Sequence, residues 1–437
     1  MSAPREGGLD APTRHPIDWQ CEDYFDADKL NKELERVFDI CHGCRRCVSL
    51  CQAFPTLFDL VDESTTMEID GVDKADYAKV AEQCYLCDLC FQTKCPYVPP
   101  HEWALDFPHL MLQAKAQAFS DHGASIRDRA MTSTDQVGRL ATLPVVNKAA
   151  NALINSRSAR GALEKSLKID REAALPNFTR PTFHQQSKES KPVVEPVAKV
   201  ALYVTCYGNH HDPKATDDLK TILEHNRIAV EVIRNERCCG MPKLELGDLQ
   251  AVDRLKRTNI PLLMEWVDKG YQITAPIPSC VLMYRQELPL MYPHDQAVQS
   301  VKAAMTDPFE LLWGLYKQGK LNTDFKSGLG RIFGQSACHQ RVQNIGPRTR
   351  DVLSLIPDTK IDWIDRCSGH DGTYAVKAET SKYARKIVRP VARKASASNP
   401  DHLTSDCPMA AKHIASAMGD DIEPLHPATL LRMAYGL

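Results

Sequence analysis

The sequence predicts an α-helical N-terminal domain followed by an α/β C-terminal region of two pseudo-symmetric cysteine-rich repeats. Three observations support this fold class. Eight of the 16 cysteines form two tight groups before residue 96. Short apolar runs alternate with helix-like stretches from about residue 198 onward. One order of cysteines and glycine occurs twice in this second part, with nearly equal spacing, which indicates an internal duplication.

Length and charge limit the class of protein. A chain of 437 residues has room for two or three domains, and a net charge of -2 argues against a general attraction to nucleic acid. No run approaches the ~18 apolar residues of a membrane-spanning helix, and the N-terminus lacks a secretory pattern. We therefore expect a cytoplasmic protein, or one that lies peripherally on the cytoplasmic membrane through a partner. Crowded cysteines in a long chain indicate metal ligation rather than a disulfide scaffold.

The two N-terminal cysteine groups have the spacing of ligands to iron–sulfur clusters. The first reads CHGCRRCVSLC, and the second reads CYLCDLCFQTKCP. Both resemble the bacterial ferredoxin run, in which the fourth cysteine of each group ligates the other cluster. Three thiolates on one curved loop reach three irons of a cubane, so the fourth iron needs a ligand from elsewhere. Soft thiolates suit such clusters.

Because the fourth cysteine of each group ligates the cluster of the other group, the pattern predicts two [4Fe-4S] clusters. One is assigned to Cys41, Cys44, Cys47 and Cys95, and the other to Cys84, Cys87, Cys90 and Cys51. Two departures from the ferredoxin pattern leave every ligand in place: Gln52 stands where proline is usual, and one extra residue precedes Cys95. The alternatives are zinc sites or buried free thiols, but zinc ribbons use paired C-x-x-C units rather than triplets with a trailing cysteine.

Helical periodicity surrounds these groups. Leu30, Leu34, Val37 and Phe38 recur at spacings of three and four before the first group, which predicts a helix. We expect an N-terminal extension over residues 1–34, a helical ferredoxin-like domain over 35–120, and a helical bridge and linker over 121–197. Pro144 should kink or split the bridge. The bridge is basic, so it either contacts a membrane face or packs against the neighbouring domain.

The C-terminal region alternates strands with helices, which predicts parallel sheets. Each predicted strand leads to a cysteine, and ligands of open parallel sheets bind beyond the carboxyl ends of strands. The first unit, residues 198–330, contains Cys206, Cys238-Cys239-Gly240 and Cys280, with Met283 three residues on. The second unit, residues 331–437, contains Cys338, Cys367-Ser368-Gly369 and Cys407, with Ala410 three residues on. We expect these seven cysteines to converge on one edge and to bind a cofactor.

The repeated pattern resembles the cysteine-rich CCG domains of heterodisulfide reductases. Together with the ferredoxin-like part, residues 35–425 resemble three iron–sulfur proteins: the C subunit of anaerobic glycerol-3-phosphate dehydrogenase, the iron–sulfur subunit of lactate utilisation and the D subunit of heterodisulfide reductase. The resemblance implies an iron–sulfur subunit that relays electrons between a partner flavin dehydrogenase and a quinone or a thiol/disulfide acceptor. Some relatives hold non-cubane clusters on five cysteines per unit.

This chain departs from the five-cysteine pattern. Met283, Ser368 and Ala410 stand where the pattern has cysteines. The four remaining thiolates of the first unit suffice for one further [4Fe-4S] cluster. The alternative is that Cys238 and Cys239 are a pair of buried structural thiols. The second unit is metal-free, or donates a thiolate to the first unit's cluster, or holds a three-cysteine cluster with an iron that is open or completed by His339, His370 or Ser368.

No residue receives a catalytic role from the sequence. The chain lacks the glycine-rich fingerprints of flavin and nucleotide sites, which places the substrate chemistry on a partner. The alternative function is a self-contained reductase of a disulfide, a peroxide or a small thiol compound at the C-terminal cysteines.

Overall fold

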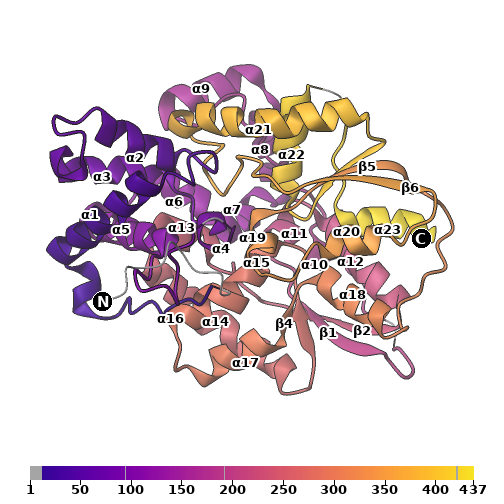
Figure 1. The fold of residues 1–437 in the computed structure, drawn as a ribbon. Helices are drawn as coiled ribbons and strands as arrows, with labels where there is room; N and C mark the ends of the chain where they lie inside the picture. Colours follow the sequence, from indigo (N-terminus) through magenta and orange to yellow (C-terminus); the bar gives the residue numbers. More distant parts are fainter. Residues whose placement is uncertain (1–11, 94, 191, 420–421) are drawn as a thin grey trace.

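The computed structural model describes residues 12–93, 95–190, 192–419 and 422–437 (Figure 1). The first eleven residues of the predicted N-terminal extension therefore lie outside the described residues. The rest of the extension is packed against the protein, since Ile17 and Trp19 are buried. Helix α1, Ala27–Cys44, runs across the predicted boundary at residue 34, so the extension and the helical domain share an element.

The N-terminal part is helical. Helix α1 begins after Asp26, whose carboxylate accepts hydrogen bonds from the backbone N–H groups of Asp28 and Lys29, and it buries the apolar stripe that the sequence predicts. The ring of Phe54 stacks on that of Phe107 at 4.7 Å between centroids, which joins α2 to α5. The further elements are η1 (Glu22–Phe25), α2 (Ala53–Asp62), η2 (Ile69–Gly71), η3 (Lys74–Asp76), α3 (Tyr77–Gln83), α4 (Leu89–Thr93) and α5 (Phe107–His122).

The bridge is a run of short helices. Pro144 is the first residue of α8, a position where its missing N–H costs no hydrogen bond, and the preceding helix α7 ends at Ala141. The buried Arg160 donates hydrogen bonds to the carbonyl oxygens of Asp170 and Ala173. The helices are α6 (Ile126–Thr132), α7 (Thr134–Ala141), α8 (Pro144–Asn155), α9 (Arg157–Leu167) and α10 (Phe183–Gln186). Figure 1 shows α9 near the long helix α21 of the second unit, and the backbone N–H of Ala378, the first residue of α21, donates to the carbonyl oxygen of Lys168, which follows α9.

The first cysteine-rich unit contains a parallel sheet in the order β2-β1-β3-β4. Its strands are β1 (Ala198–Leu202), β2 (Ile228–Val232), β3 (Gln272–Thr274) and β4 (Met305–Thr306). The two-residue strand β4 is too short to be recognised from a sequence pattern. The helices are α11 (Cys206–His210), α12 (Pro213–His225), α13 (Met241–Leu246), α14 (Leu249–Val267), α15 (Pro278–Leu282), the π-helix η4 (Met283–Glu287), α16 (Leu288–Met291), α17 (Gln296–Ala304) and α18 (Pro308–Lys317).

The second unit contains a parallel sheet in the order β6-β5-β7. Its strands are β5 (Gly330–Gln335), β6 (Thr359–Ile364) and β7 (His402–Ser405). The order second-first-third is also that of the first three strands of the first unit, which supports an internal duplication. The helices are α19 (Cys338–Arg341), α20 (Arg348–Leu353), α21 (Ala378–Ser398), α22 (Pro408–Met418) and α23 (Pro427–Tyr435).

The two units are tied together by the C-terminal helix α23, which packs on α12 of the first unit. The guanidinium of Arg432 donates to the Asp218 carboxylate at 2.6 Å, and the Thr429 hydroxyl donates to the same group. Asp218 is fully buried, so these contacts compensate a charge that would otherwise destabilise the fold. Among the described residues, no helix combines the length and the apolarity needed to cross a bilayer.

Candidate iron–sulfur sites

The first N-terminal quartet gathers where α1 ends. Cys41 and Cys44 lie in the last turn of α1, and Arg45 follows in the left-handed conformation, with φ 51°, which turns the chain toward Cys47. These three cysteines and Cys95 line one hollow together with apolar side chains such as Phe54 and Leu105. Burial, and then the nearby thiols of Cys95, Cys47 and Cys44, raise the pKa of the Cys41 thiol well above its usual value.

The second quartet surrounds the loop between α3 and α4. Leu86 and Asp88 have φ values of 55° and 60°, so the backbone curves around the side chains of this loop. Cys51, from the first sequence group, lies here: burial raises its pKa, and the thiols of Cys84 and Cys87 raise it further. Burial and the thiol of Cys84 likewise raise the pKa of Cys90. Each quartet thus gathers four sulfur donors, three from one loop and one from the other sequence group, in largely apolar surroundings, the donor set that a cubane requires.

The first cysteine-rich unit brings its four cysteines together beyond the carboxyl ends of β1, β2 and β3. Hydrogen bonds with Cys206 and Cys239 lower the pKa of Cys238, and Cys239 in turn hydrogen-bonds with Cys280. The Met283 side chain is fully buried and packs near Gly240, which has φ 102°. Four convergent thiols fit one further [4Fe-4S] cluster, whereas the thioether of Met283 is a weaker donor than a thiolate.

A threonine of the helical bridge contacts two cysteines of this unit. The Thr134 hydroxyl lies 3.1 Å from the sulfur of Cys206 and 3.4 Å from that of Cys238. Thr134 is the first residue of α7. The sequence carries no signal for this contact, because a single threonine in a basic helical stretch has no distinguishing pattern.

The three cysteines of the second unit do not all lie together. Cys338 hydrogen-bonds with Cys367 and also with Cys87 of the second N-terminal quartet. The hydrogen bond with Cys338 lowers the pKa of Cys367 to about 7 against the opposing effect of burial, and the Tyr85 hydroxyl, 3.2 Å from the sulfur, lowers it further. No hydrogen bond joins Cys407 to Cys338 or Cys367 in the part of the chain that the structure describes. The pair Cys338–Cys367 therefore adjoins the N-terminal domain, while Cys407 stands apart.

One cavity connects these groups. It measures about 220 Å³ and its lining is largely apolar. All seven cysteines of the C-terminal region line it, as do Ser368 and Ala410, the residues that replace cysteines in the second unit. The sequence placed these cysteines at strand ends, and the structure shows that the ends of the two sheets face one shared cavity.

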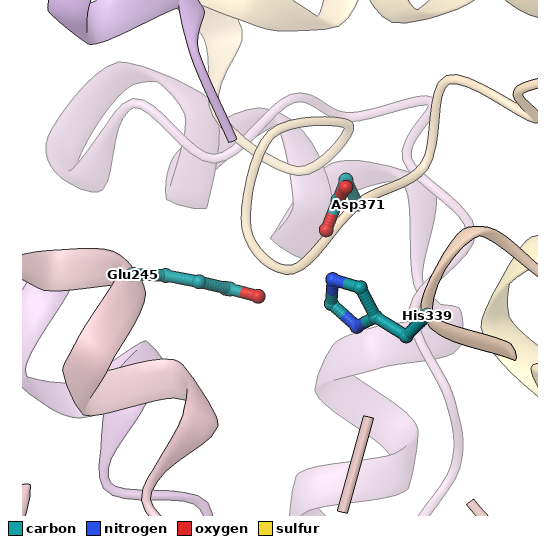
Figure 2. Close-up of side chains that lie close together, drawn as sticks. All are labelled: Glu245, His339 and Asp371. Carbon is teal, nitrogen blue, oxygen red and sulfur yellow. The ribbon is translucent and has the colours of Figure 1, made fainter. Parts of the chain in front are cut away.

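The three candidate non-cysteine ligands differ in their surroundings. Ser368 is buried, and its hydroxyl oxygen accepts a hydrogen bond from the backbone N–H of His370 at 3.4 Å. His370 is also buried, and burial followed by the nearby His413 lowers its pKa to about 3. His339 lies beside Glu245 and Asp371 (Figure 2). Burial raises the pKa of Glu245 to about 7 against the opposing charges of Lys115 and Lys377.

Comparison with known proteins agrees with the cysteine pattern. The family model described as the CCG cysteine-rich domain matches residues 200–285, within the first unit. The C subunit of anaerobic glycerol-3-phosphate dehydrogenase of Escherichia coli is 26% identical over 71% of this chain and 77% of its own length. An uncharacterised iron–sulfur protein of Methanocaldococcus jannaschii is 25% identical over 89% of this chain and 69% of its own length.

Lactate utilization protein A of Oceanobacillus iheyensis is 22% identical over 53% of this chain and 96% of its own length. The resemblance drawn from the repeated cysteine pattern is therefore confirmed. The chain carries a CCG cysteine-rich domain and is related to iron–sulfur subunits of oxidoreductases.

Proposed function

We propose that this chain is an iron–sulfur electron-transfer subunit of a dehydrogenase complex. Two [4Fe-4S] clusters would lie on the N-terminal quartets and a third on Cys206, Cys238, Cys239 and Cys280. The observation that carries the proposal is the contact of Cys87 with Cys338, because it joins an N-terminal quartet to the cavity where the other cysteines meet. Each bound cluster would accept and donate one electron.

The arrangement of sulfur atoms defines a continuous route. Cys47 of the first quartet lies near Cys90 of the second, since its charge raises the pKa of the Cys90 thiol. Cys51 links the quartets covalently through the chain. Beyond them, Cys87 adjoins Cys338 and Cys367 at the cavity wall. In this proposal the protein's own residues would hold the clusters one after another in apolar surroundings.

The electron donor in this proposal is a partner flavoprotein, because the chain has no flavin fingerprint of its own. One relative is named as a subunit of a dehydrogenase and another as a lactate utilization protein, which supports a redox partner. The acceptor would be a quinone or a thiol/disulfide compound at the cavity.

A second candidate is reduction of a small disulfide by this chain itself. The observation that favours it is the Cys367 thiol, whose pKa is lowered to about 7 by its hydrogen bond with Cys338 and which lines a cavity of about 220 Å³. Two electrons from the partner and two protons would cleave one S–S bond and release two thiols. A thiol with this pKa is partly ionised at neutral pH and is a competent nucleophile.

Three measurements test these functions. Anaerobically prepared protein should contain about twelve irons per chain with three clusters and about eight with the N-terminal pair alone. Anaerobic capture should recover a flavoprotein that reduces the clusters when its substrate is added. Steady turnover of a disulfide by the isolated chain with an artificial electron donor would favour the second candidate, and absence of cluster reduction by any captured flavoprotein would count against the first.

We further propose a peripheral membrane contact through α7 and α8. Leu140, Leu143 and Val145 are exposed by 63%, 48% and 82% at the junction of the two helices, beside the exposed Arg139 and Lys148. Apolar side chains flanked by basic ones suit the interface of an anionic bilayer. Sedimentation with anionic vesicles tests this contact: replacing Leu143 and Val145 with serine should release the protein, and unchanged sedimentation would refute it.

A further inference from the structure

Three side chains from separate parts of the chain meet in the wall of the cavity. Glu245 belongs to α13, His339 to α19, and Asp371 to the loop after β6. One donor atom of each residue lies within 4.8 Å of the other two. Figure 2 shows both carboxylates directed toward the imidazole ring of His339. None of the three is a cysteine, and none belongs to the proposed cluster ligands.

His339 is oriented as a metal ligand would be. Its side chain is only 9% exposed, and its Nε2 atom has no hydrogen-bond partner among the described residues. The ring hydrogen-bonds to the backbone of Leu86, in the loop of the second N-terminal quartet. Histidines that bind metals commonly donate their second ring N–H to a backbone carbonyl, which fixes the ring and frees the other nitrogen for the metal.

The two carboxylates lack ion-pair partners. Within the described residues, neither Glu245 nor Asp371 takes part in an ion pair, and the buried Oδ2 atom of Asp371 has no hydrogen-bond partner. Lys377 pairs with Asp128 instead, and Lys115 acts on the charge of Glu245 only from a distance. Two acids without ion-pair partners at the edge of a largely apolar cavity stay protonated on their own, and a cation bound between them would allow both to ionise.

The backbone makes room for this arrangement at Gly372. A Cβ atom on Gly372 would overlap the Oε2 atom of Glu245, and the residue has φ 47°. A side chain at this position would therefore displace the Glu245 carboxylate from its place opposite His339. The glycine after Asp371 allows the second unit's loop to approach the first unit's α13.

We propose that Glu245, His339 and Asp371 bind one divalent first-row transition-metal ion. One imidazole nitrogen and two carboxylate oxygens suit Mn²⁺, Fe²⁺ or Zn²⁺ and disfavour a soft ion such as Cu⁺. Three protein ligands leave further coordination positions open to water or to a small ligand in the cavity. Ligands about 2.1 Å from one ion lie roughly 3–3.5 Å apart, so binding draws the three side chains together by small rotations.

The test uses the cluster-containing protein after a chelator has removed loosely bound ions. Mn²⁺ is the probe, and the electron paramagnetic resonance of free Mn²⁺ reports how much remains unbound. We expect one Mn²⁺ per chain, and an affinity lowered at least about tenfold in Glu245→Gln, His339→Gln and Asp371→Asn. Gly372→Ala removes no ligand and should weaken binding as well. His370→Gln, in the same cavity but outside the triad, is the matched control and should bind like the natural protein.

Nitrogen coupling to the bound Mn²⁺, measured by pulsed resonance, supplies a second readout that needs no variant. Its presence in the natural protein is expected from the His339 ligand. The proposal is overturned if no Mn²⁺ binds, if the bound ion shows no nitrogen coupling, or if well-folded variants of all three residues bind it unchanged. The iron content of each variant reports folding. Because the triad shares no ligand with the clusters, loss of Mn²⁺ binding with full iron content leaves the proposed electron transfer untouched.

Discussion

The thiol of Cys338 hydrogen-bonds with the thiol of Cys87, although 251 positions separate them in the chain. Cys87 belongs to the loop of the second N-terminal quartet, and Cys338 begins α19 beyond β5 of the second unit. This contact makes the degenerate unit a neighbour of the N-terminal domain. It also places Cys338 and Cys367, whose own unit has only three cysteines, beside Cys87, whose quartet has four.

Replacing Cys338 with serine should leave the iron content unchanged, because Cys338 is not among the assigned ligands. The resonance spectrum of the reduced second cluster should shift, since the thiol that hydrogen-bonds with its Cys87 ligand becomes a shorter and more polar hydroxyl and such bonds tune iron–sulfur potentials. Cys407→Ser is the control, as Cys407 stands apart from this pair, and it should leave that spectrum as it is. A loss of about four irons in the Cys338 variant would instead make Cys338 a cluster ligand.

Replacing Cys239 with alanine should remove the cluster proposed for the first unit. Iron content measured after anaerobic preparation should fall from about twelve to about eight per chain, while the N-terminal clusters remain. Cys21 is exposed and lies outside every group, so Cys21→Ala serves as the control and should retain all the iron. Equal iron in the Cys239 variant and the natural protein would show that this unit holds no cluster.

Arg14 should contribute strongly to stability. Its guanidinium is buried and pairs with Asp88, with Asp106 at 2.8 Å and with Glu287 at 3.7 Å. Arg14→Ala would leave the buried Asp88 without an ion-pair partner, and Asp106 and Glu287 with His109 alone, so we expect a loss of about 3–5 kcal/mol in the free energy of unfolding by denaturant.

The exposed ion pair of Arg36 with Glu33 provides the comparison. Arg36→Ala should cost less than about 1 kcal/mol, because water screens such a pair. Similar losses in the two variants would mean that the buried network around Arg14 does not hold the N-terminal segment to the first unit.

Glu287 gives the same network a pH dependence. Burial alone would raise its pKa, but the hydrogen bond and charge of His109, followed by Arg14, lower it to about 2. Since the unfolded value is about 4.3, its stabilisation is fully present above about pH 4.3 and is lost as the pH falls toward 2.

Circular dichroism of the natural protein and of Glu287→Gln between pH 5 and pH 2.5 checks this expectation. The natural protein should be the more stable at pH 5, by on the order of 2 kcal/mol, and the difference should shrink with acidification. Cluster loss in acid affects both proteins, so the difference isolates Glu287. A difference that grows as the pH falls would contradict the assignment.

Much of the candidate chemistry was accessible from local patterns. Thiolates two residues apart on one loop are a local property, and the apolar stripe Leu30, Leu34, Val37 and Phe38 predicted the buried face of α1. The order of cysteines and glycine likewise led to the CCG resemblance, which the family match over residues 200–285 confirms. The pair His370-Asp371 after Cys367-Ser368-Gly369 is a weak sign of further polar ligands, and the pattern names only His370 as a candidate.

The sequence by itself determined which cysteines belong to each loop, where strands alternate with helices, and which family the repeated motif resembles, because spacing and periodicity act over a few residues. Only the tertiary structure decided that Cys338 meets Cys87, that Thr134 reaches Cys206, and that Glu245, His339 and Asp371 face one another. Each of these contacts joins residues that are dozens to hundreds of positions apart. They follow from how the two sheets and the helical domain pack around one cavity, and no local pattern encodes that packing.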